Sequence, residues 1–175
     1  MKIILYMAMT ANGMIAREND DTPWSKEAWG EYYKFVKQKK NIIVGRRTYE
    51  MMKSVNEFEK LNNPATVVLS GKSHGIKNNM FFAKSPKEAV ELLKKKGFEE
   101  IVVGGGGKCN ASFLESGLID EIYLDIEPFV FGNGIRLFSE IDAEAGLNLI
   151  KVRKLSKNTL RLIYKVKKRA EEKRK

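Results

Sequence analysis

The stretch IVVGGGGKCNASFLESGLIDEIYLDIEP, residues 101–128, carries the pattern that decides the fold class. A β-branched run at residues 100–103 precedes four consecutive glycines, then a helical segment at 110–116 and another strand-like run at 121–127. This order is typical of a parallel α/β unit, whose ligands bind beyond the carboxyl ends of the strands. The sequence therefore predicts a site at the glycine turn.

The same alternation of strands and helices continues outward from this stretch. Ser25 is an N-cap signal, as is Ser85 with a proline after it, and Gly97 is a helix stop. We predict further strands at residues 2–9, 41–45, 65–70 and 80–83, helices at 26–39, 48–53 and 86–96, and a closing antiparallel pair at 147–154 and 159–167. The fold class is thus α/β, with a mostly parallel sheet and antiparallel C-terminal strands.

Length and composition indicate one globular domain. The chain has 175 residues, of which 43% are hydrophobic and 31% charged, which excludes a disordered protein. No apolar run approaches the roughly 20 residues of a membrane-spanning helix, and the start of the chain does not resemble a secretory signal. Cys109 is the only cysteine and His74 the only histidine, so we expect no internal disulfide, no metal site and a cytoplasmic location.

The positive charge is concentrated at one end. The net charge is +10, and residues 151–175 hold 12 of the 32 basic residues but only two acidic ones. A nucleic-acid footprint would lie across a folded face instead. We therefore predict a domain at residues 1–164 and a solvated basic tail at 165–175, with no nucleic-acid partner.

Three predicted strand ends carry groups that suit phosphate. Gly104 to Gly107 let backbone N–H groups approach an anion, although four glycines can also make a simple tight turn. A second strand ends in a glycine followed by Arg46, Arg47 and Thr48, and a third ends in Ser70-Gly71-Lys72. Two such turns suggest a dinucleotide, and the third suits an additional phosphate such as that of NADPH.

These motifs resemble the dihydrofolate reductase superfamily. MAMTANGMIA (residues 7–16) is similar to its first strand and active-site loop, VGRRTYE (44–50) to its cofactor turn and VVLSG (67–71) to its adenosine-side strand. The segment from residue 101 to FGNGIRLF (131–138) resembles the reductase domain of the bifunctional riboflavin-synthesis deaminase-reductases. The resemblance implies the three-layer α/β/α fold of that superfamily.

The resemblance also implies NADPH and a set of site residues. Ala8 and Ile15 would hold the nicotinamide amide through their backbone, and the peptide between Gly104 and Gly105 would be cis. The implied cofactor-binding residues are Ala8, Ile15, Gly45, Arg46, Arg47, Thr48, Leu69, Ser70, Gly71, Lys72, Val103, Gly104, Gly105, Gly106, Gly107 and Lys108. The implied substrate-binding residues are Met7, Ala8, Trp29, Tyr33, Met52 and Asp125.

Typical dihydrofolate reductases bind the substrate through a carboxylate on their first helix, and this chain has no acid at that position. By resemblance that acid would stand at Trp29, and the flanking Glu27 and Glu31 point elsewhere on the helix, so we expect them to be solvated. Asp125, between two apolar strand residues, is the candidate catalytic group. We expect it to recognise the heterocycle with a raised pKa, the alternative being a cap on a backbone amide.

Several functions remain open at this stage. The leading one is reduction of a pterin C=N bond, with dihydrofolate as the substrate, although only Lys60 stands near the place of the usual folate-tail arginine. The alternative is a diaminopyrimidine ribosyl phosphate of riboflavin synthesis, with Arg136 or Lys108 near its phosphate. A third is a non-catalytic nucleotide or nucleic-acid binding module. The riboflavin-type branch is often dimeric, so the resemblance also suggests a homodimer.

Overall fold

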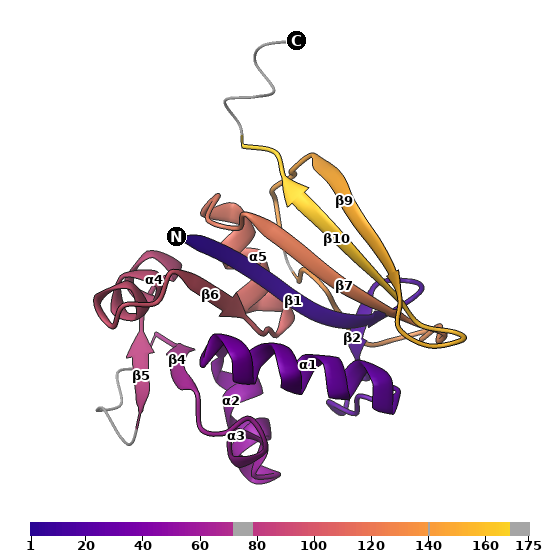
Figure 1. Cartoon of the computed structure of the whole chain (residues 1–175), viewed down its shortest axis with the longest axis horizontal. Helices are drawn as coiled ribbons and strands as arrows, with labels where there is room; N and C mark the ends of the chain where they lie inside the picture. Colours follow the sequence, from indigo (N-terminus) through magenta and orange to yellow (C-terminus); the bar gives the residue numbers. More distant parts are fainter. Residues whose placement is uncertain (72–78, 140, 169–175) are drawn as a thin grey trace.

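An eight-stranded sheet forms the centre of the molecule in the computed structural model, which describes residues 1–71, 79–139 and 141–168 (Figure 1). The strand order is β5-β4-β3-β6-β1-β7-β10-β9, and β2 pairs with β8 in a separate two-stranded sheet. The strands are β1 (Lys2–Thr10), β2 (Met14–Ala16), β3 (Asn41–Gly45), β4 (Ala65–Leu69), β5 (Met80–Ala83), β6 (Glu100–Val103), β7 (Glu121–Glu127), β8 (Ile135–Arg136), β9 (Leu147–Lys154) and β10 (Leu160–Val166).

The strand directions confirm the predicted fold class. Strands β5, β4, β3, β6, β1 and β7 are parallel to one another, whereas β10 pairs antiparallel with both β7 and β9. Parallel neighbours require crossover helices, which cover both faces of the sheet. The closing pair needs only a hairpin, so no helix follows β9.

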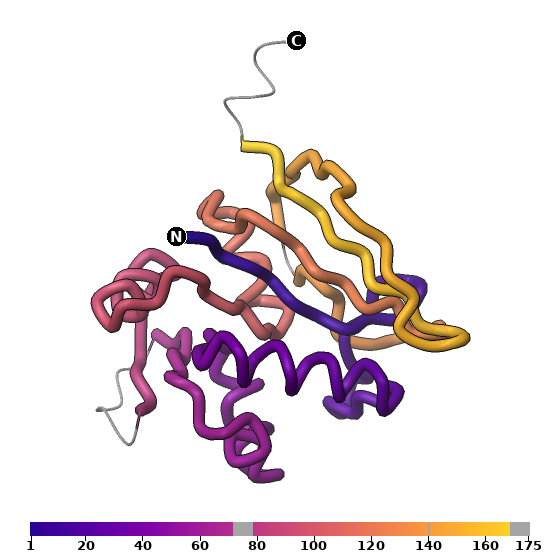
Figure 2. Tube along the Cα trace, in the orientation of Figure 1, coloured from indigo at the N-terminus to yellow at the C-terminus, as the bar shows by residue number. Residues whose placement is uncertain are grey.

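Two apolar cores lie on opposite faces of the sheet, as expected for three layers. The path of the chain through the sheet and the helices can be followed in Figure 2. One contains Leu93 of α4 and Phe113 of α5, and the other contains Val36 of α1 and Met52 of α2. The helices are α1 (Lys26–Lys39), α2 (Arg46–Ser54), α3 (Glu57–Lys60), α4 (Pro86–Lys95) and α5 (Gly107–Glu115). None of the helices in the described ranges is long and apolar enough to cross a membrane.

Three short elements and several boundaries differ from the prediction, and α5 begins at Gly107 rather than Asn110. Elements β2, α3 and β8 have two to four residues, too few to show a period in the sequence. Helix α2 begins at Arg46, so both arginines lie in its first turn, and β10 includes Lys165 and Val166, which we assigned to the tail. Val166 packs in the core. Lys72, His74 and residues 169–175 lie outside the described residues.

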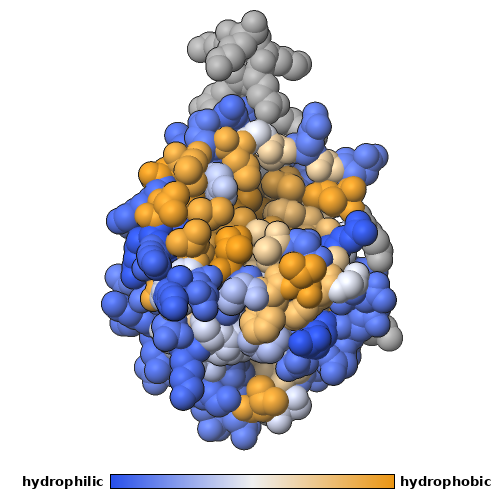
Figure 3. Space-filling view, turned by 90° about the vertical axis from the view of Figure 1, so that its right-hand side faces the viewer, coloured by the Kyte–Doolittle hydropathy of each residue, from blue (hydrophilic) through white to orange (hydrophobic). Residues whose placement is uncertain are grey.

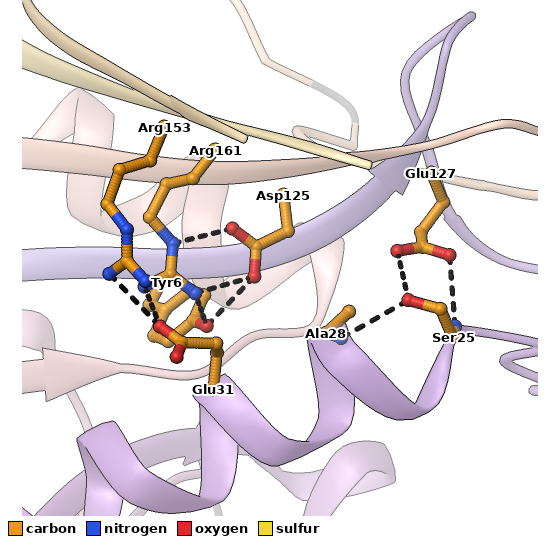
Figure 4. A network of polar contacts seen from close by, with 8 residues as sticks. All are labelled: Tyr6, Ser25, Ala28, Glu31, Asp125, Glu127, Arg153 and Arg161. Carbon is orange, nitrogen blue, oxygen red and sulfur yellow. Dashed lines mark hydrogen bonds and ion pairs between the residues drawn. The ribbon is translucent and has the colours of Figure 1, made fainter. Parts of the chain in front are cut away.

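The start of helix α1 is fixed by a carboxylate from the sheet. Glu127, at the end of β7, is 1% exposed and accepts hydrogen bonds from the backbone N and the Oγ of Ser25, both at 2.9 Å (Figure 4). The same Ser25 Oγ accepts the amide of Ala28 at 3.2 Å, as an N-cap does. Glu127 therefore joins the sheet to the helix that forms one wall of the site.

We expect Glu127→Ala to lower the free energy of unfolding by about 1–3 kcal/mol, because the Ser25 amide loses its buried acceptor. Urea unfolding measures this change. Glu115→Ala removes an exposed carboxylate from α5 and is the matched control, with a change within about 0.5 kcal/mol. Equal stability of the two variants would contradict the anchoring role of Glu127.

Candidate functional site

A cavity of about 1300 Å³ lies where the carboxyl ends of the parallel strands meet. Four of the predicted segments converge on it: the β1 to β2 region, the start of α2, the end of β4 and the glycine turn. The residues that they contribute are Met7, Ala8, Ile15, Gly45, Arg46, Arg47, Thr48, Leu69, Gly104, Gly106, Gly107 and Lys108. Ser70, Gly71, Val103 and Gly105 are next to these residues in the chain but are not part of the cavity wall.

Two helices begin at this cavity with glycine N-caps. Gly45 caps α2 and Gly106 caps α5, and neither helix receives a side-chain cap. The amide of Gly45 donates to the carbonyl of Gly105 at 2.7 Å, which holds the two helix starts together. Uncapped backbone N–H groups at helix N-termini favour anions, so this pair is suited to a pyrophosphate.

The glycine turn leaves no room for side chains. A Cβ atom on Gly107 would lie 2.5 Å from the carbonyl oxygen of Arg136, and Gly105 has a φ of +96°, which favours glycine. The cis peptide joins Gly105 to Gly106, so the expected position, Gly104–Gly105, is wrong by one residue. Glycine is therefore required here by space as well as by conformation, and the turn fits the close approach of a dinucleotide backbone.

The two arginines of α2 lie at the mouth of the cavity. Arg47 binds Asp20 at 2.9 Å and the carbonyl of Glu18 at 3.0 Å, so it holds the loop between β2 and α1 against α2. Arg46 lies 3.9 Å from Glu50, one turn along the same helix. Both guanidinium groups are substantially exposed and remain close to the uncapped helix start. They extend the positive potential of that helix end.

An aromatic wall and two methionines line the other half of the cavity. Trp29 and Tyr33 of α1 stack with ring centroids 5.6 Å apart and planes 24° from parallel. Tyr32, Met51 and Met52 complete this wall. The predicted substrate-side residues Met7, Ala8, Trp29, Tyr33 and Met52 are all brought together. Flat aromatic faces at this spacing suit a planar ring system.

Helix α3 contributes two residues to the cavity, of which the sequence identified only Lys60 as a candidate. Glu57 is buried and lines the cavity, and its Oε2 lies 3.2 Å from the Nζ of Lys60. Lys60 also lines the cavity, but this ion pair occupies its ammonium group. A four-residue helix following a run of polar residues offers no sequence pattern that would have singled out Glu57.

Asp125 lies on the cavity floor in a network of charged groups (Figure 4). Its Oδ1 accepts Arg161 Nε at 2.7 Å, and its Oδ2 accepts Arg161 Nη2 at 2.8 Å and the Tyr6 hydroxyl at 2.9 Å. Arg161 Nη2 also contacts the Tyr6 oxygen. The expected apolar setting of Asp125 is therefore wrong, and so is the alternative of a backbone cap.

Glu31 joins the same network. Its Oε2 accepts Arg161 Nη1 at 3.1 Å and Arg153 Nη1 at 3.2 Å, so the solvated position expected for it is wrong (Figure 4). Glu27 is exposed, as predicted. Arg161, the partner of both Asp125 and Glu31, was not identified from the sequence. The available signal was a single charged residue between Leu160 and Leu162 on a strand.

Burial and pairing shift the pKa values of two members of this network. Burial, followed by the negative charge of Asp125, raises the pKa of Tyr6 far above its ordinary value. Burial alone would lower the pKa of Arg161, but its hydrogen bond to Asp125 and the nearby Tyr6 and Glu31 raise it overall. The guanidinium group is thus charged and the phenol neutral at any physiological pH.

Outside the network, Cys109 is a packing residue in the core. It is 4% exposed, and burial raises the pKa of its thiol to about 12. The described residues contain no cluster of acidic, histidine and cysteine side chains that could hold a metal ion.

Residues 1–161 match the family described as the RibD C-terminal domain. The chain belongs to this family. It is 30% identical over 154 residues to the uncharacterized protein YwjB of Bacillus subtilis (strain 168). This alignment covers 85% of this chain and 88% of YwjB. It is 27% identical over 134 residues to the dihydrofolate reductase of Buchnera aphidicola subsp. Baizongia pistaciae, covering 76% of each chain.

Solved structures of RibD-like proteins share the fold. A structure from Shewanella sp. PV-4 named for riboflavin biosynthesis superimposes with a TM-score of 0.81, at 22% identity, over 95% of this chain and 99% of that one. The TM-score is 0.73, at 16% identity, for a diaminohydroxyphosphoribosylaminopyrimidine deaminase/5-amino-6-(5-phosphoribosylamino)uracil reductase from Thermotoga maritima. The superposition covers 95% of this chain and 56% of that one. The resemblance to this superfamily and the predicted fold are confirmed.

We expect Arg161→Met to lower the free energy of unfolding by about 3–5 kcal/mol, because Asp125 is 0% exposed and would keep a buried charge without its cation. Chemical denaturation measures the loss. Arg153→Met is the matched control, since Arg153 stands opposite Arg161 on β9 and also binds Glu31 but is 47% exposed. It should cost at most about 1 kcal/mol, and a similarly small loss for Arg161→Met would contradict the assignment.

Proposed function

We propose that this member of the RibD C-terminal domain family is an NADPH-dependent reductase that acts on a planar nitrogen heterocycle. The observation that carries the proposal is the two-part cavity of about 1300 Å³, with two uncapped helix starts at one side and an aromatic wall at the other. Pockets for a single drug-sized ligand measure about 300–1000 Å³. The volume and lining therefore suit a dinucleotide and a second ring system together.

The glycine turn and the two helix starts would hold the cofactor. Gly106 and Gly107 offer backbone N–H groups to the pyrophosphate, with Thr48 and the arginines of α2 beside them. By the family resemblance, Ser70 would contact the adenosine phosphate together with Lys72, which lies outside the described residues. NADPH, when bound, supplies the hydride. The backbone of Ala8 and Ile15 would orient the nicotinamide ring toward the aromatic wall.

The substrate class follows from the family and from the walls of the cavity. We place a diaminopyrimidine ribosyl phosphate ahead of dihydrofolate, because the matched family is that of RibD and Trp29 stands where a dihydrofolate reductase has its carboxylate. Arg136 and Lys108 both line the cavity, which supports a seat for a sugar phosphate. Lys60, paired with Glu57, is a poor clamp for a folate tail.

Asp125 has a positioning role in this proposal. Both of its oxygens are occupied by Arg161 and Tyr6, so it holds these groups in the floor of the cavity rather than donating a proton to substrate. Arg161, in turn, connects the floor to Glu31 on α1. The network would thus keep the aromatic wall of α1 at a fixed distance from the sheet.

Oxidation of NADPH, followed at 340 nm, tests the proposed function. The heterocycles offered in parallel are 5-amino-6-(5-phosphoribosylamino)uracil, dihydrofolate and dihydrobiopterin, and we expect the first to be reduced fastest. Faster reduction of dihydrofolate would reverse the order of substrates. NADPH binding without turnover of any of the three would favour the non-catalytic nucleotide-binding module instead.

Arg46→Gln should weaken NADPH binding about tenfold in the same preparation, because one charge-assisted contact to phosphate is lost. Titration calorimetry measures this affinity. Lys53→Gln, on the last turn of the same helix and away from the cavity lining, is the control and should bind NADPH normally.

A homodimer is a second part of the proposal. The outer strands carry an exposed apolar patch, formed by Leu147, Leu149, Val152 and Leu160, on the side of the molecule that Figure 3 presents. Leu149 stands opposite Tyr164 and Val152 opposite Leu162, so these residues share one face of the sheet. No helix covers this face beyond α5. A two-fold axis lets a second copy cover such a patch with the same patch.

We expect Val152→Lys to shift the protein from dimer to monomer, because Val152 is 52% exposed at the centre of the patch and a charge there opposes burial. Light scattering after gel filtration measures the mass. Lys154→Ala on the same strand is the control and should remain dimeric. A wild-type protein that is monomeric at all concentrations would rule out this assembly.

A further inference from the structure

Ser139, in the connection between β8 and β9, lies beside the first residue of α5. A Cβ atom on Gly107 would overlap the Ser139 hydroxyl, so that hydroxyl is in contact with the backbone of the glycine turn. Both residues line the cavity. None of the motifs in the sequence includes Ser139, and the structure therefore brings a hydroxyl without an assigned role to the phosphate side of the cavity.

Three hydrogen bonds hold this part of the connection in place. The backbone N of Ser139 donates to the carbonyl of Gly107 at 3.2 Å. The carbonyl of Leu137 accepts Nδ2 of Asn110, on α5, at 2.8 Å, and the backbone N of Leu137 donates to the carbonyl of Gly13 at 3.0 Å. The Ser139 side chain is thus held at the start of α5 without using its own oxygen. A group held in this way is preorganised for a ligand.

The Ser139 hydroxyl is accessible and only weakly bonded. Its one hydrogen bond within the described residues is to the carbonyl of Arg136, which is 3.4 Å away, and this bond is exposed. Hydrogen bonds between two oxygens usually span about 2.5–3.0 Å, so this one is long and weak. The hydroxyl is therefore free to turn its proton toward a stronger acceptor in the cavity.

A second hydroxyl stands at the neighbouring glycine. A Cβ atom on Gly106 would lie 3.1 Å from the Oγ1 of Thr48, in the first turn of α2. Gly106 is the N-cap of α5 and Gly107 its first residue, and no side chain caps this helix. A phosphate carries several acceptor oxygens, so it can accept the backbone amides and both hydroxyls together.

We propose that Ser139 is a further cofactor-binding residue, whose hydroxyl donates a hydrogen bond to an oxygen of the cofactor pyrophosphate. The inference rests on the proposed function and adds to its phosphate side a residue from outside the four predicted segments. Ser139 and Thr48 would bind the pyrophosphate from two different elements, at successive residues of the glycine turn. Hydrogen bonds to an ionised acceptor are stronger than those to a neutral carbonyl, so the hydroxyl would exchange its weak bond to Arg136 for a better one.

Ser139→Ala tests the assignment with two probes, NADPH and 2′-phospho-ADP-ribose, which keeps the pyrophosphate but has no nicotinamide. We expect the Kd of both to rise by the same factor, about 5- to 20-fold, because each loses one charge-assisted hydrogen bond. Titration calorimetry measures both affinities. The melting temperature of the free protein should stay the same, because the bond that the variant loses there is weak.

The matched control is Ser116→Ala. Ser116 follows the last turn of α5, where its hydroxyl donates to the carbonyl of Ser112 at 2.7 Å, and it does not line the cavity. This variant should bind both probes as the wild-type protein does. Ser139→Asp is a second test, in which a carboxylate repels the phosphates, so the affinity for both probes should fall further than with alanine.

The outcomes separate this inference from the proposed function. If the wild-type protein binds both probes but Ser139→Ala keeps both Kd values within twofold, this inference alone fails. A loss of affinity confined to NADPH would also overturn it, because the effect would then come from the nicotinamide and not from the pyrophosphate. If the wild-type protein binds neither probe, the proposed function fails and this inference fails with it.

Discussion

The 2.7 Å hydrogen bond from the Gly45 amide to the Gly105 carbonyl is the contact on which the site depends. It joins the ends of β3 and β6, two strands that are neighbours in the sheet but far apart in the sequence. Helix α2 starts directly after β3, and α5 starts after the glycine turn that follows β6, so the bond brings two helix N-termini to the same cavity. The positive ends of both helices are thereby available to one anionic ligand.

The two faces of the cavity are built on different physical grounds. The phosphate side uses backbone groups and needs glycine, since a Cβ on Gly107 would meet a carbonyl oxygen. The ring side uses side chains of α1, α2 and α3, of which α1 is held by charged contacts to the sheet. Glu127 fixes the first residue of α1 and Glu31 ties its second turn to Arg161. A rigid wall of this kind preserves the spacing that a stacked ring requires.

Much of the fold could be predicted because its signals are local. The bounds predicted for α1, β3, β5, β6, β7 and β9 coincide with those in the structure, since Ser25, the β-branched runs and the glycines act within a few residues. The glycine turn was located for the same reason, whereas α2 begins two residues before its predicted start. The elements that escaped prediction, β2, α3 and β8, are stabilised by partners distant in the chain and have no pattern of their own.

The same contrast between local signals and long-range contacts separates the two sides of the site. Sequence alone determined the glycine turns for which we propose phosphate binding, because a strand, a glycine and a helix start are consecutive and their backbone geometry follows from residue type. Only the tertiary structure decided the setting of Asp125, where register places Arg161 directly opposite it, and the setting of Glu57, where a short helix turns a carboxylate toward the wall of α1. Packing across the sheet and between helices decides which charged or hydrogen-bonding partner a side chain meets. The partners are distant in the sequence, so no local pattern encodes the pairing.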